Sequence, residues 1–431
     1  AVAHDTLGKV LTVLGRHAQA AVQYEAAIGR AAANPELHYR HGTSLLFCGE
    51  LDRAQAAFRR AIELDPLHVL SHLALAENFP ANDPDARIAR LQATLARVRG
   101  NADDELIMHH ALARTLETAG RSAEAFAHFV TGKQARKIAV GYTIEEDKRI
   151  FAAAERLFPA GEEVRQQPAK GEATEAPIFV LGMARTGTTL VERILSSHSE
   201  VISGGELSSL GHSVWEAGGR LGRHINPDTW REALSEDPQL IGQRYRAHAA
   251  VTVGDAERFI DKRPLNYFLI GFIRRSLPNA RIVCLRRGAL DTCIANLRHF
   301  FSPQKVNYRY ALALEDIAEY FAMFERLMEH WHRVFPGAIH DIRYERLVTD
   351  FDGEVRSLLE YLGLPFEPSV GSFHENQEPV ATASAVQVRQ PLYASSIGSW
   401  RRYATEMEPV RQRLLELGVD VRDRDPGVAV P

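Results

Sequence analysis

The chain has 431 residues, of which 45% are apolar and 25% are charged, and its formal net charge is −4. This is ordinary globular composition and enough chain for two or three domains. The small negative charge argues against a general nucleic-acid or anionic-membrane binder, so any basic site must be local. The three cysteines, Cys48, Cys284 and Cys293, show no CxxC spacing. That argues against disulfides and a cysteine metal site, and favours a reducing, cytoplasmic location.

Membrane attachment is not expected either. No apolar run approaches the roughly 18 residues that a spanning helix requires. The chain begins at Ala1 rather than at methionine and is already in a helical pattern there. We therefore expect it to be a fragment of a longer protein.

Residues 1–138 have a helical pattern that repeats every 34 positions. The first unit's Gly8, Gly15, Ala20, Tyr24 and Ala27 recur as Gly42, Gly49, Ala54, Phe58 and Ala61, and a later unit carries Leu112, Ala113, Gly120, Ala125 and Phe129. This period resembles that of a tetratricopeptide-repeat array, an all-α solenoid. Stacked helix pairs form a concave surface suited to peptides. The alternative is that the array only caps or dimerises the neighbouring domain.

Residues 139–176 have the pattern of a connector, with one more helix over 142–158 and then a surface linker. From 177 to 431, strands alternate with helices, which predicts an α/β domain with a central parallel sheet. The expected strands are 178–183, 258–261, 281–285 and 338–343, and the expected helices are 188–197, 228–251, 266–276, 290–301 and 312–335. Ligands of such sheets bind beyond the carboxyl ends of the strands.

The stretch 177–190 organises the α/β domain. A short apolar strand is followed by Gly182 and Gly187, and an amphipathic helix then starts at Thr188. In this layout backbone N–H groups converge on an anion, and the helix N-terminus adds partial positive charge. The glycine spacing matches a P-loop, but Thr188 stands where lysine is expected, and the cation inside the loop is Arg185. The pattern predicts an anion other than a standard nucleoside triphosphate.

The residues from Gly182 to Ser199, followed by Gly204-Gly205-Glu206-Leu207, resemble the bacterial tetratricopeptide-repeat sulfotransferases, relatives of the tyrosylprotein sulfotransferases. The resemblance covers the whole chain. It implies 3′-phosphoadenosine 5′-phosphosulfate (PAPS) as donor, a hydroxyl as acceptor, and no required metal. The loop residues that it implies for the donor's phosphosulfate are Arg185, Thr186, Gly187, Thr188, Thr189 and Leu190. A guanidinium suits this group because its forked N–H donors reach two oxygens.

Glu206 lies 21 residues after Arg185, the separation that the resemblance implies for the catalytic glutamate. An acceptor hydroxyl loses its proton as it attacks sulfur, and a nearby carboxylate can accept that proton. With an ordinary pKa of about 4.3, glutamate is ionised but weakly basic, and partial burial would raise its basicity. The alternative is that Glu206 stabilises the start of a helix near Leu207.

Lys262 follows the expected strand 258–261, in the sequence Asp-Lys-Arg-Pro-Leu-Asn. The resemblance implies that this lysine contacts the bridging oxygen of the donor. Negative charge builds on that oxygen as it leaves, so a fixed ammonium stabilises the transition state more than the ground state. We expect Asp261 to orient neighbouring groups, and a surface salt bridge is the alternative role for Lys262.

Arg287 follows the expected strand 281–285, and the resemblance implies that it binds the donor's 3′-phosphate, with Arg286 as the fallback. The sequence departs from the family here. The family's Asp-Pro is replaced by Gly288-Ala289 and its serine by Ala295, with Thr292 or Asn296 as candidates to compensate. Losing one hydrogen bond would cost about 1–1.5 kcal/mol of binding free energy.

Two further segments complete the expected donor site. Tyr344 closes the strand 338–343, and the resemblance implies that its hydroxyl reaches the donor's phosphate region, with packing under the sheet edge as the alternative. Residues 387–391 and 399–403 resemble the segment that folds over the donor. Their basic and aromatic side chains suit adenine stacking or phosphate binding.

Two other function classes stay open. One is a P-loop-type nucleotide-dependent kinase, for which Asp261 and Asp291 are the nearest magnesium ligands. The other is a repeat-based protein-binding scaffold with an inactive sulfotransferase-like domain. Within the preferred class, the repeats beside the site favour a peptide or protein acceptor, while the site residues are equally consistent with small-molecule or glycan acceptors. A homo-oligomer is compatible with all of these.

Overall fold

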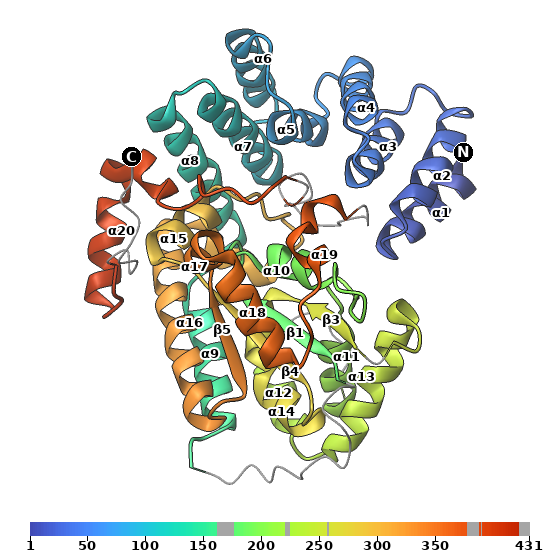
Figure 1. Ribbon diagram of the computed structural model, residues 1–431. Helices are drawn as coiled ribbons and strands as arrows, with labels where there is room; N and C mark the ends of the chain where they lie inside the picture. Colours follow the sequence, from blue (N-terminus) through green and yellow to red (C-terminus); the bar gives the residue numbers. More distant parts are fainter. Residues whose placement is uncertain (162–175, 220–224, 257, 377–387, 389, 422–431) are drawn as a thin grey trace.

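The computed structural model describes residues 1–161, 176–219, 225–256, 258–376, 388 and 390–421. It has two parts: an N-terminal array of helix pairs and an α/β domain built on a parallel sheet. Figure 1 shows the array arching over one end of the α/β domain. None of the described helices combines the length and apolar character that crossing a bilayer requires.

The array confirms the predicted tetratricopeptide-like helix pairs. It contains α1 (Val2–Val13), α2 (His17–Ile28), α3 (Pro35–Cys48), α4 (Leu51–Leu64), α5 (Val69–Asn78), α6 (Pro84–Arg97), α7 (Ala102–Thr118) and α8 (Ser122–Val140). In the third pair Pro84 starts α6, and the Asp83 carboxylate caps this helix by accepting a hydrogen bond from the Ala86 N–H. The predicted boundaries of the array at 138 and of the connector at 176 stay predictions.

The 34-residue period repeats one packing arrangement. Gly8 lies against the ring of Tyr24, and a Cβ added to this glycine would come within 2.6 Å of that ring. One repeat later Gly42 lies in the same way against Phe58, at 2.8 Å. The missing side chain thus lets the two helices of each pair approach until the aromatic ring fills the space between them.

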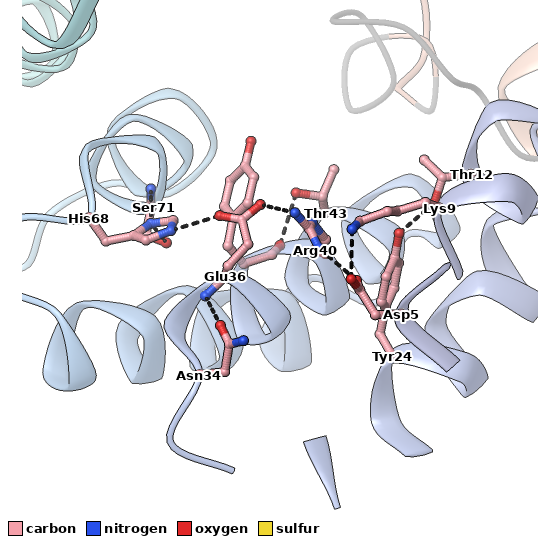
Figure 2. Close-up of polar contacts among 11 residues, drawn as sticks. Asp5, Lys9, Thr12, Tyr24, Asn34, Glu36, Arg40, Thr43, His68 and Ser71 are labelled. Carbon is pink, nitrogen blue, oxygen red and sulfur yellow. Dashed lines mark hydrogen bonds and ion pairs between the residues drawn. The ribbon is translucent and has the colours of Figure 1, made fainter. Parts of the chain in front are cut away.

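Polar contacts also join successive repeat units (Figure 2). Asp5 on α1 accepts hydrogen bonds from Lys9 at 2.7 Å and from Arg40 on α3 at 2.6 Å. Arg40 also pairs with Glu36 at 2.9 Å, and Glu36 contacts His68, the N-cap of α5, at 3.1 Å. Such partly exposed pairs each contribute ~0–1 kcal/mol, so their main effect is to fix the relative positions of the units.

The α/β domain confirms the predicted central parallel sheet. Its strands are β1 (Ile178–Gly182), β2 (Ile202–Ser203), β3 (Phe259–Lys262), β4 (Arg281–Arg286) and β5 (Ile339–Arg343), in the order β2-β3-β1-β4-β5. β1 lies at the centre, with Ile178 opposite Ile260 on one side and Arg281 on the other. Every residue of β1 and β3 is buried, as expected for a sheet covered on both faces.

Helices cover both faces of the sheet. Val180 and Ile260 pack with α10 (Thr188–Leu195) and α18 (Phe351–Leu362) in one core. Phe179 and Ile282 belong to the larger core on the other face, together with α13 (Pro238–Val253), α14 (Ile270–Ser276) and α16 (Leu314–Val334). This larger core is continuous with the core of α7 and α8 and with Phe151 on α9 (Glu145–Leu157), the helix expected in the connector.

The remaining elements connect or flank the strands and helices named above. They are α11 (Ser209–Ala217), α12 (Pro227–Ala233), η1 (Pro264–Leu269), α15 (Ala289–Leu297), η2 (Val306–Leu312), α17 (Tyr344–Thr349), α19 (Pro368–Gly371), η3 (Phe373–Glu375), η5 (Ser399–Tyr403) and α20 (Ala404–Glu416). The single helix expected over 228–251 is wrong: it is two helices, because Pro238 starts α13 and Asp237 caps it.

Candidate active site

The predicted site residues meet at one edge of the sheet. The glycine loop follows β1, Lys262 ends β3, Arg287 follows β4 and Tyr344 follows β5. Glu206 comes three residues after the edge strand β2. Because the strands are parallel and β1 is central, the loop lies between the lysine side of the edge and the Arg287 side.

The loop is a tightly packed turn. Gly182 has a φ of +145°, and a Cβ there would come within 2.5 Å of the Leu285 carbonyl oxygen. Gly187 has a φ of +107°, and a Cβ there would come within 2.8 Å of the Tyr344 ring. Both positions therefore require glycine. Arg185 also has a positive φ, +68°, which is uncommon for a residue with a side chain and frequent at functional sites.

The loop contains one hydroxyl that stabilises its shape and leads into a helix N-terminus that can bind an anion. The Thr186 hydroxyl donates to the Met183 carbonyl at 2.7 Å, so this side chain shapes the loop itself. Thr188, Thr189 and Leu190 form the first turn of α10, whose N-terminus faces the loop. Leu190 packs against the adjacent core, and its N–H donates to the Gly187 carbonyl at 3.0 Å. The loop and this first helical turn together form an anion-binding layout.

Two guanidinium groups lie close together at the loop. Arg287 donates through Nη1 to the Arg185 carbonyl at 3.0 Å and through Nη2 to the Ser396 carbonyl at 2.5 Å, and its guanidinium lies 4.7 Å from the centre of the Tyr344 ring. Burial and, secondly, the charge of Arg287 lower the pKa of Arg185 to about 10. Such a site favours an anion, which would offset the repulsion between the two cations.

The Nε atom of Arg287 also indicates an anion-binding site. It is buried and has no hydrogen-bond partner among the residues that the structure describes. Buried guanidinium N–H groups normally have an acceptor, because leaving one without a partner costs about 1–3 kcal/mol. A phosphate oxygen is an acceptor of the right kind. The residues around Arg287 therefore fit the bisphosphate part of the expected donor.

Lys262 lies between two carboxylates. Its Nζ donates to Glu206 Oε1 at 2.9 Å and lies 3.6 Å from Glu192 Oε2, and the lysine is only 1% exposed. Glu192, on α10, also accepts a hydrogen bond from the Ser203 hydroxyl at 2.7 Å. The sequence reasoning missed Glu192, although a charged residue within the buried helix run Val191–Leu195 was a usable signal.

These contacts set the protonation states of the pair. Partial burial is the largest single influence and would raise the pKa of Glu206, but the charges of Lys262, Lys305 and Arg263 and the hydrogen bond from Lys262 together lower it. Burial alone would lower the pKa of Lys262, but the carboxylates of Glu192 and Glu206 raise it. Glu206 is therefore ionised and Lys262 protonated near neutral pH. The expectation that burial would make Glu206 more basic is wrong for this arrangement.

Asp261 faces away from this pair into the protein. It is fully buried and accepts hydrogen bonds from the Tyr245 hydroxyl and from Asn266 Nδ2, both at 3.3 Å. Burial raises the pKa of Asp261 to about 7, despite the opposing charges of Arg263 and Lys262. The carboxyl group ties the end of β3 to η1, which agrees with an orienting function.

Arg286, Asn296 and Thr292 are the alternative or compensating residues for the 3′-phosphate. All three form hydrogen bonds within the protein. Arg286 pairs with Glu325 through two hydrogen bonds and lies 3.6 Å from Asp341. The Asn296 amide donates to the Ala184 and Thr292 carbonyls, both at 2.9 Å. The bond to Ala184 fixes the backbone of the glycine loop. Thr292 is fully buried. These side chains hold the scaffold around Arg287.

Asp291 holds the C-terminal segment against α15. It accepts hydrogen bonds from the N–H groups of Gly398 at 2.6 Å and Trp400 at 3.0 Å, and from the Ser399 hydroxyl at 2.9 Å. The predicted segment 399–403 is therefore brought to the site. In the predicted segment 387–391, residues 387 and 389 lie outside the described residues. Among the described residues, no group of three or more His, Cys, Asp or Glu side chains could hold a metal ion.

A hollow opens next to the residues that follow β3. Arg263 reaches it, and its Nη1 donates to the Ser208 hydroxyl at 2.8 Å and to the Leu207 carbonyl at 3.2 Å. Most of the rest of the lining is apolar: Val214 and Trp215 come from α11, Ile225 from the segment before α12, Trp230 from α12, and Leu265 and Leu269 from η1. The hollow therefore adjoins the residues that follow Lys262 at the end of β3.

Comparison with known proteins identifies the domain that carries this site. Residues 177–368 match the sulfotransferase family, and residues 35–66 match the tetratricopeptide repeat. The α/β domain is a sulfotransferase-family domain. The matched range contains the loop, Glu206, Lys262, Arg287 and Tyr344, so the family's match and the polar edge of the sheet coincide.

Two curated relatives match the chain over much of its length. An uncharacterized protein of Aquifex aeolicus is 30% identical over 377 residues, covering 85% of this chain but 48% of its own length, so the chain spans about half of that relative. A putative protein-tyrosine sulfotransferase of Caenorhabditis briggsae is 25% identical over 58% of this chain and 92% of its own.

Among solved structures, the sulfotransferase domain of a Synechococcus olefin synthase matches with 17% identity and a TM-score of 0.39, over 59% of this chain and 99% of its own. A sulfotransferase from Mycobacterium avium matches with 14% identity and a TM-score of 0.36, over 80% and 98% respectively. Similarity at this level supports no conclusion about the activity of the sulfotransferase domain.

Proposed function

We propose that this protein transfers a sulfuryl group from PAPS to an acceptor hydroxyl in a single in-line step. The observation that carries the proposal is the buried ammonium of Lys262 held 2.9 Å from the Glu206 carboxylate, next to the glycine loop. A proton acceptor and a cation placed side by side suit a transfer in which one oxygen loses a proton while another gains charge.

The donor would be held by the residues around the loop. In this proposal Arg185, the loop amides and the first turn of α10, with Thr188, Thr189 and Leu190, bind the 5′-phosphosulfate. Arg287 binds the 3′-phosphate, for which its buried Nε offers a hydrogen bond, and Tyr344 flanks it. Backbone N–H groups and guanidinium donors together neutralise the donor's charge, so the proposal requires no metal ion.

Glu206 is the proposed general base and Lys262 the proposed stabiliser of the leaving oxygen. In the free enzyme the lysine lowers the pKa of Glu206, which makes the carboxylate a weak base. As negative charge develops on the leaving oxygen, that oxygen competes with Glu206 for the ammonium. The carboxylate then becomes more basic as the acceptor hydroxyl loses its proton, so the two events assist each other.

The acceptor would approach from the side of the apolar hollow, because in-line attack brings it in opposite the leaving group. A peptide or protein acceptor bound by the repeat array agrees with the arch above the site (Figure 1) and with the name of the Caenorhabditis relative. A small-molecule or glycan hydroxyl fits the same site residues. The reaction is placed in the cytoplasm, where the few reduced cysteines would be stable.

Donor binding tests the proposal. Calorimetric titration with adenosine 3′,5′-bisphosphate, without magnesium, is expected to show binding that Arg287→Ala weakens by about tenfold or more, because a charged hydrogen bond contributes about 1.5–3 kcal/mol. The same Arg287 substitution should leave binding of adenosine 5′-monophosphate almost unchanged. No binding of the bisphosphate at millimolar concentration would refute the proposal, and magnesium-dependent binding of ATP would favour the kinase alternative.

A further inference from the structure

A buried lysine joins the repeat array to the sulfotransferase domain. Lys133 lies on α8 and is 3% exposed. Its Nζ donates to three carbonyl oxygens of the other domain: Asn296 at 2.9 Å, Ala311 at 3.0 Å and His299 at 3.1 Å. An ammonium has three N–H donors, so these carbonyls satisfy it completely.

Neutral acceptors are unusual partners for a buried charge. Buried ammonium groups are normally paired with carboxylates, yet the acceptors of Lys133 among the residues that the structure describes are carbonyl oxygens. Its acceptors belong to the last turn of α15 and to the segment that leads through η2. Carbonyl groups at a helix C-terminus carry partial negative charge and favour a cation there, while burial lowers the pKa of Lys133 to about 7.

The same turn of α15 supports the donor loop. Asn296 receives the bond from Lys133 on its carbonyl, while its side-chain amide donates to the Ala184 carbonyl at 2.9 Å. The Tyr310 hydroxyl donates to the amide oxygen of Asn296 at 3.0 Å and fixes the amide's orientation. One residue therefore connects the ammonium of the repeat array with the residue that precedes Arg185.

A second set of hydrogen bonds, made by Glu117, joins the repeat array to the C-terminal end of α15. Glu117 on α7 is 7% exposed and accepts a hydrogen bond from Arg298, just after α15, at 2.5 Å. The Tyr403 hydroxyl donates to the same carboxylate. The last helix pair of the array thus contacts the C-terminal end of α15 at two positions, through Lys133 and through Glu117. Both contacts lie near the segment held by Asp291.

We propose that Lys133 is a positioning residue of the donor site, acting through Asn296 on the loop that contains Arg185. The inference rests on the proposed function, and it makes the last helix pair of the repeat array a structural part of the sulfotransferase site. Removing the ammonium takes one donor from each of three carbonyl oxygens, of which that of Asn296 keeps the His299 N–H at 3.4 Å, and lets the turn around Asn296 shift. The loop backbone at residues 184 and 185 then loses its fixed position.

The test compares two lysines on the same helix. Lys133→Met is expected to weaken binding of adenosine 3′,5′-bisphosphate about tenfold, equivalent to about 1.4 kcal/mol. It should raise KM for the donor while turnover at saturating donor changes little. Lys137→Met is the matched control, because Lys137 also crosses to the other domain, pairing with Asp316 on α16 at 2.5 Å, but does not reach the loop. Equal affinity in the two variants would overturn the inference.

A double-mutant cycle tests the route. If Lys133 acts through Asn296, then Lys133→Met and Asn296→Ala together should weaken bisphosphate binding by clearly less than the product of their separate effects. Fully multiplicative effects would contradict that route. If the wild-type protein fails to bind the bisphosphate at all, the proposed function fails first, which distinguishes the two outcomes.

Hydrogen exchange of the unmodified chain gives an answer even if Lys133→Met does not fold. Coupling between sites is reciprocal, so bisphosphate should slow amide exchange in α8 as well as in the loop. Exchange in α1 and α2, at the far end of the array, should not change. Protection of the loop without any change in α8 would contradict the inference.

Discussion

Replacing Lys262 by methionine should destabilise the sulfotransferase domain, not only inactivate it. The ammonium is 1% exposed, and it lies 2.9 Å from a carboxylate whose side chain is 40% exposed and 3.6 Å from one whose side chain is 11% exposed. Losing the pair with the exposed Glu206 costs little, because water solvates that carboxylate. Losing the cation next to Glu192 leaves a mostly buried negative charge, which costs several kcal/mol.

We expect Lys262→Met to lower the free energy of unfolding by ~2–4 kcal/mol. Urea unfolding followed by tryptophan fluorescence measures this loss in the relevant domain, because all four tryptophans, Trp215, Trp230, Trp331 and Trp400, lie in it. Adding Glu192→Gln to the lysine variant removes the uncompensated charge while keeping an acceptor for Ser203. The double variant should therefore recover ~1–2 kcal/mol.

Glu206→Gln is the matched control for this experiment. It removes one partner of the same lysine from the exposed side, so it should change the unfolding free energy by less than about 1 kcal/mol. The reasoning is refuted if Lys262→Met is as stable as the wild-type protein, or if the double variant is no more stable than Lys262→Met.

Three further substitutions have defined outcomes. Burial raises the pKa of Asp261 to about 7, so its folded state retains a proton that the unfolded state releases near pH 4, and its contribution to stability is lost as pH rises through 7. Asp261→Asn should therefore gain ~1–3 kcal/mol of stability relative to wild type between pH 5 and pH 8, measured by urea titration at both values; a constant difference would contradict this. Asp291→Ala removes three hydrogen bonds to residues 398–400, so limited proteolysis should cut near that segment faster than in wild type, and an unchanged rate would argue against its anchoring role. Gly187→Ala forces a Cβ to within 2.8 Å of the Tyr344 ring at a φ of +107° and should cost ~1–3 kcal/mol, and a melting temperature equal to wild type would show that the loop is not tightly packed.

The local signals in the sequence were sufficient for the fold and for the main site residues. The apolar run before Gly182 and the glycine spacing identify a strand, a loop and a helix from neighbouring residues alone. The 34-residue period is equally local, since Gly8 and Tyr24 belong to one helix pair. Lys262 and Arg287 could be anticipated because parallel strands bring their carboxyl ends to one edge.

The partners of these residues could not be predicted, because they depend on contacts between distant segments. Glu192 meets Lys262 only after α10 packs beside β3. Asp291 was a candidate magnesium ligand in the sequence, yet it caps a segment more than a hundred residues away. Lys133 resembles a solvent-facing lysine on a repeat helix until the sulfotransferase domain buries it.

The pKa of Glu206 could not be predicted either, because it depends on charges that distant segments bring close. Burial alone predicts a raised pKa, and the combined effect of the cations Lys262, Lys305 and Arg263 reverses the sign. Sequence spacing gave the separation of 21 residues from Arg185, but not the 2.9 Å contact that controls the charge of this carboxylate.

Transfer of labelled sulfate from PAPS tests the central claim most directly. The donor is incubated with the wild-type protein and with Glu206→Gln, using a panel of a phenol, a tyrosine-containing peptide, an alkyl alcohol and a sugar. We predict label on at least one acceptor with the wild-type protein, and a rate lower by about 10²–10⁴-fold with Glu206→Gln although it binds adenosine 3′,5′-bisphosphate normally. Near-normal turnover by Glu206→Gln at saturating acceptor would contradict the assignment of the base, and absence of label on every acceptor despite bisphosphate binding would contradict the proposed activity towards these four classes of hydroxyl.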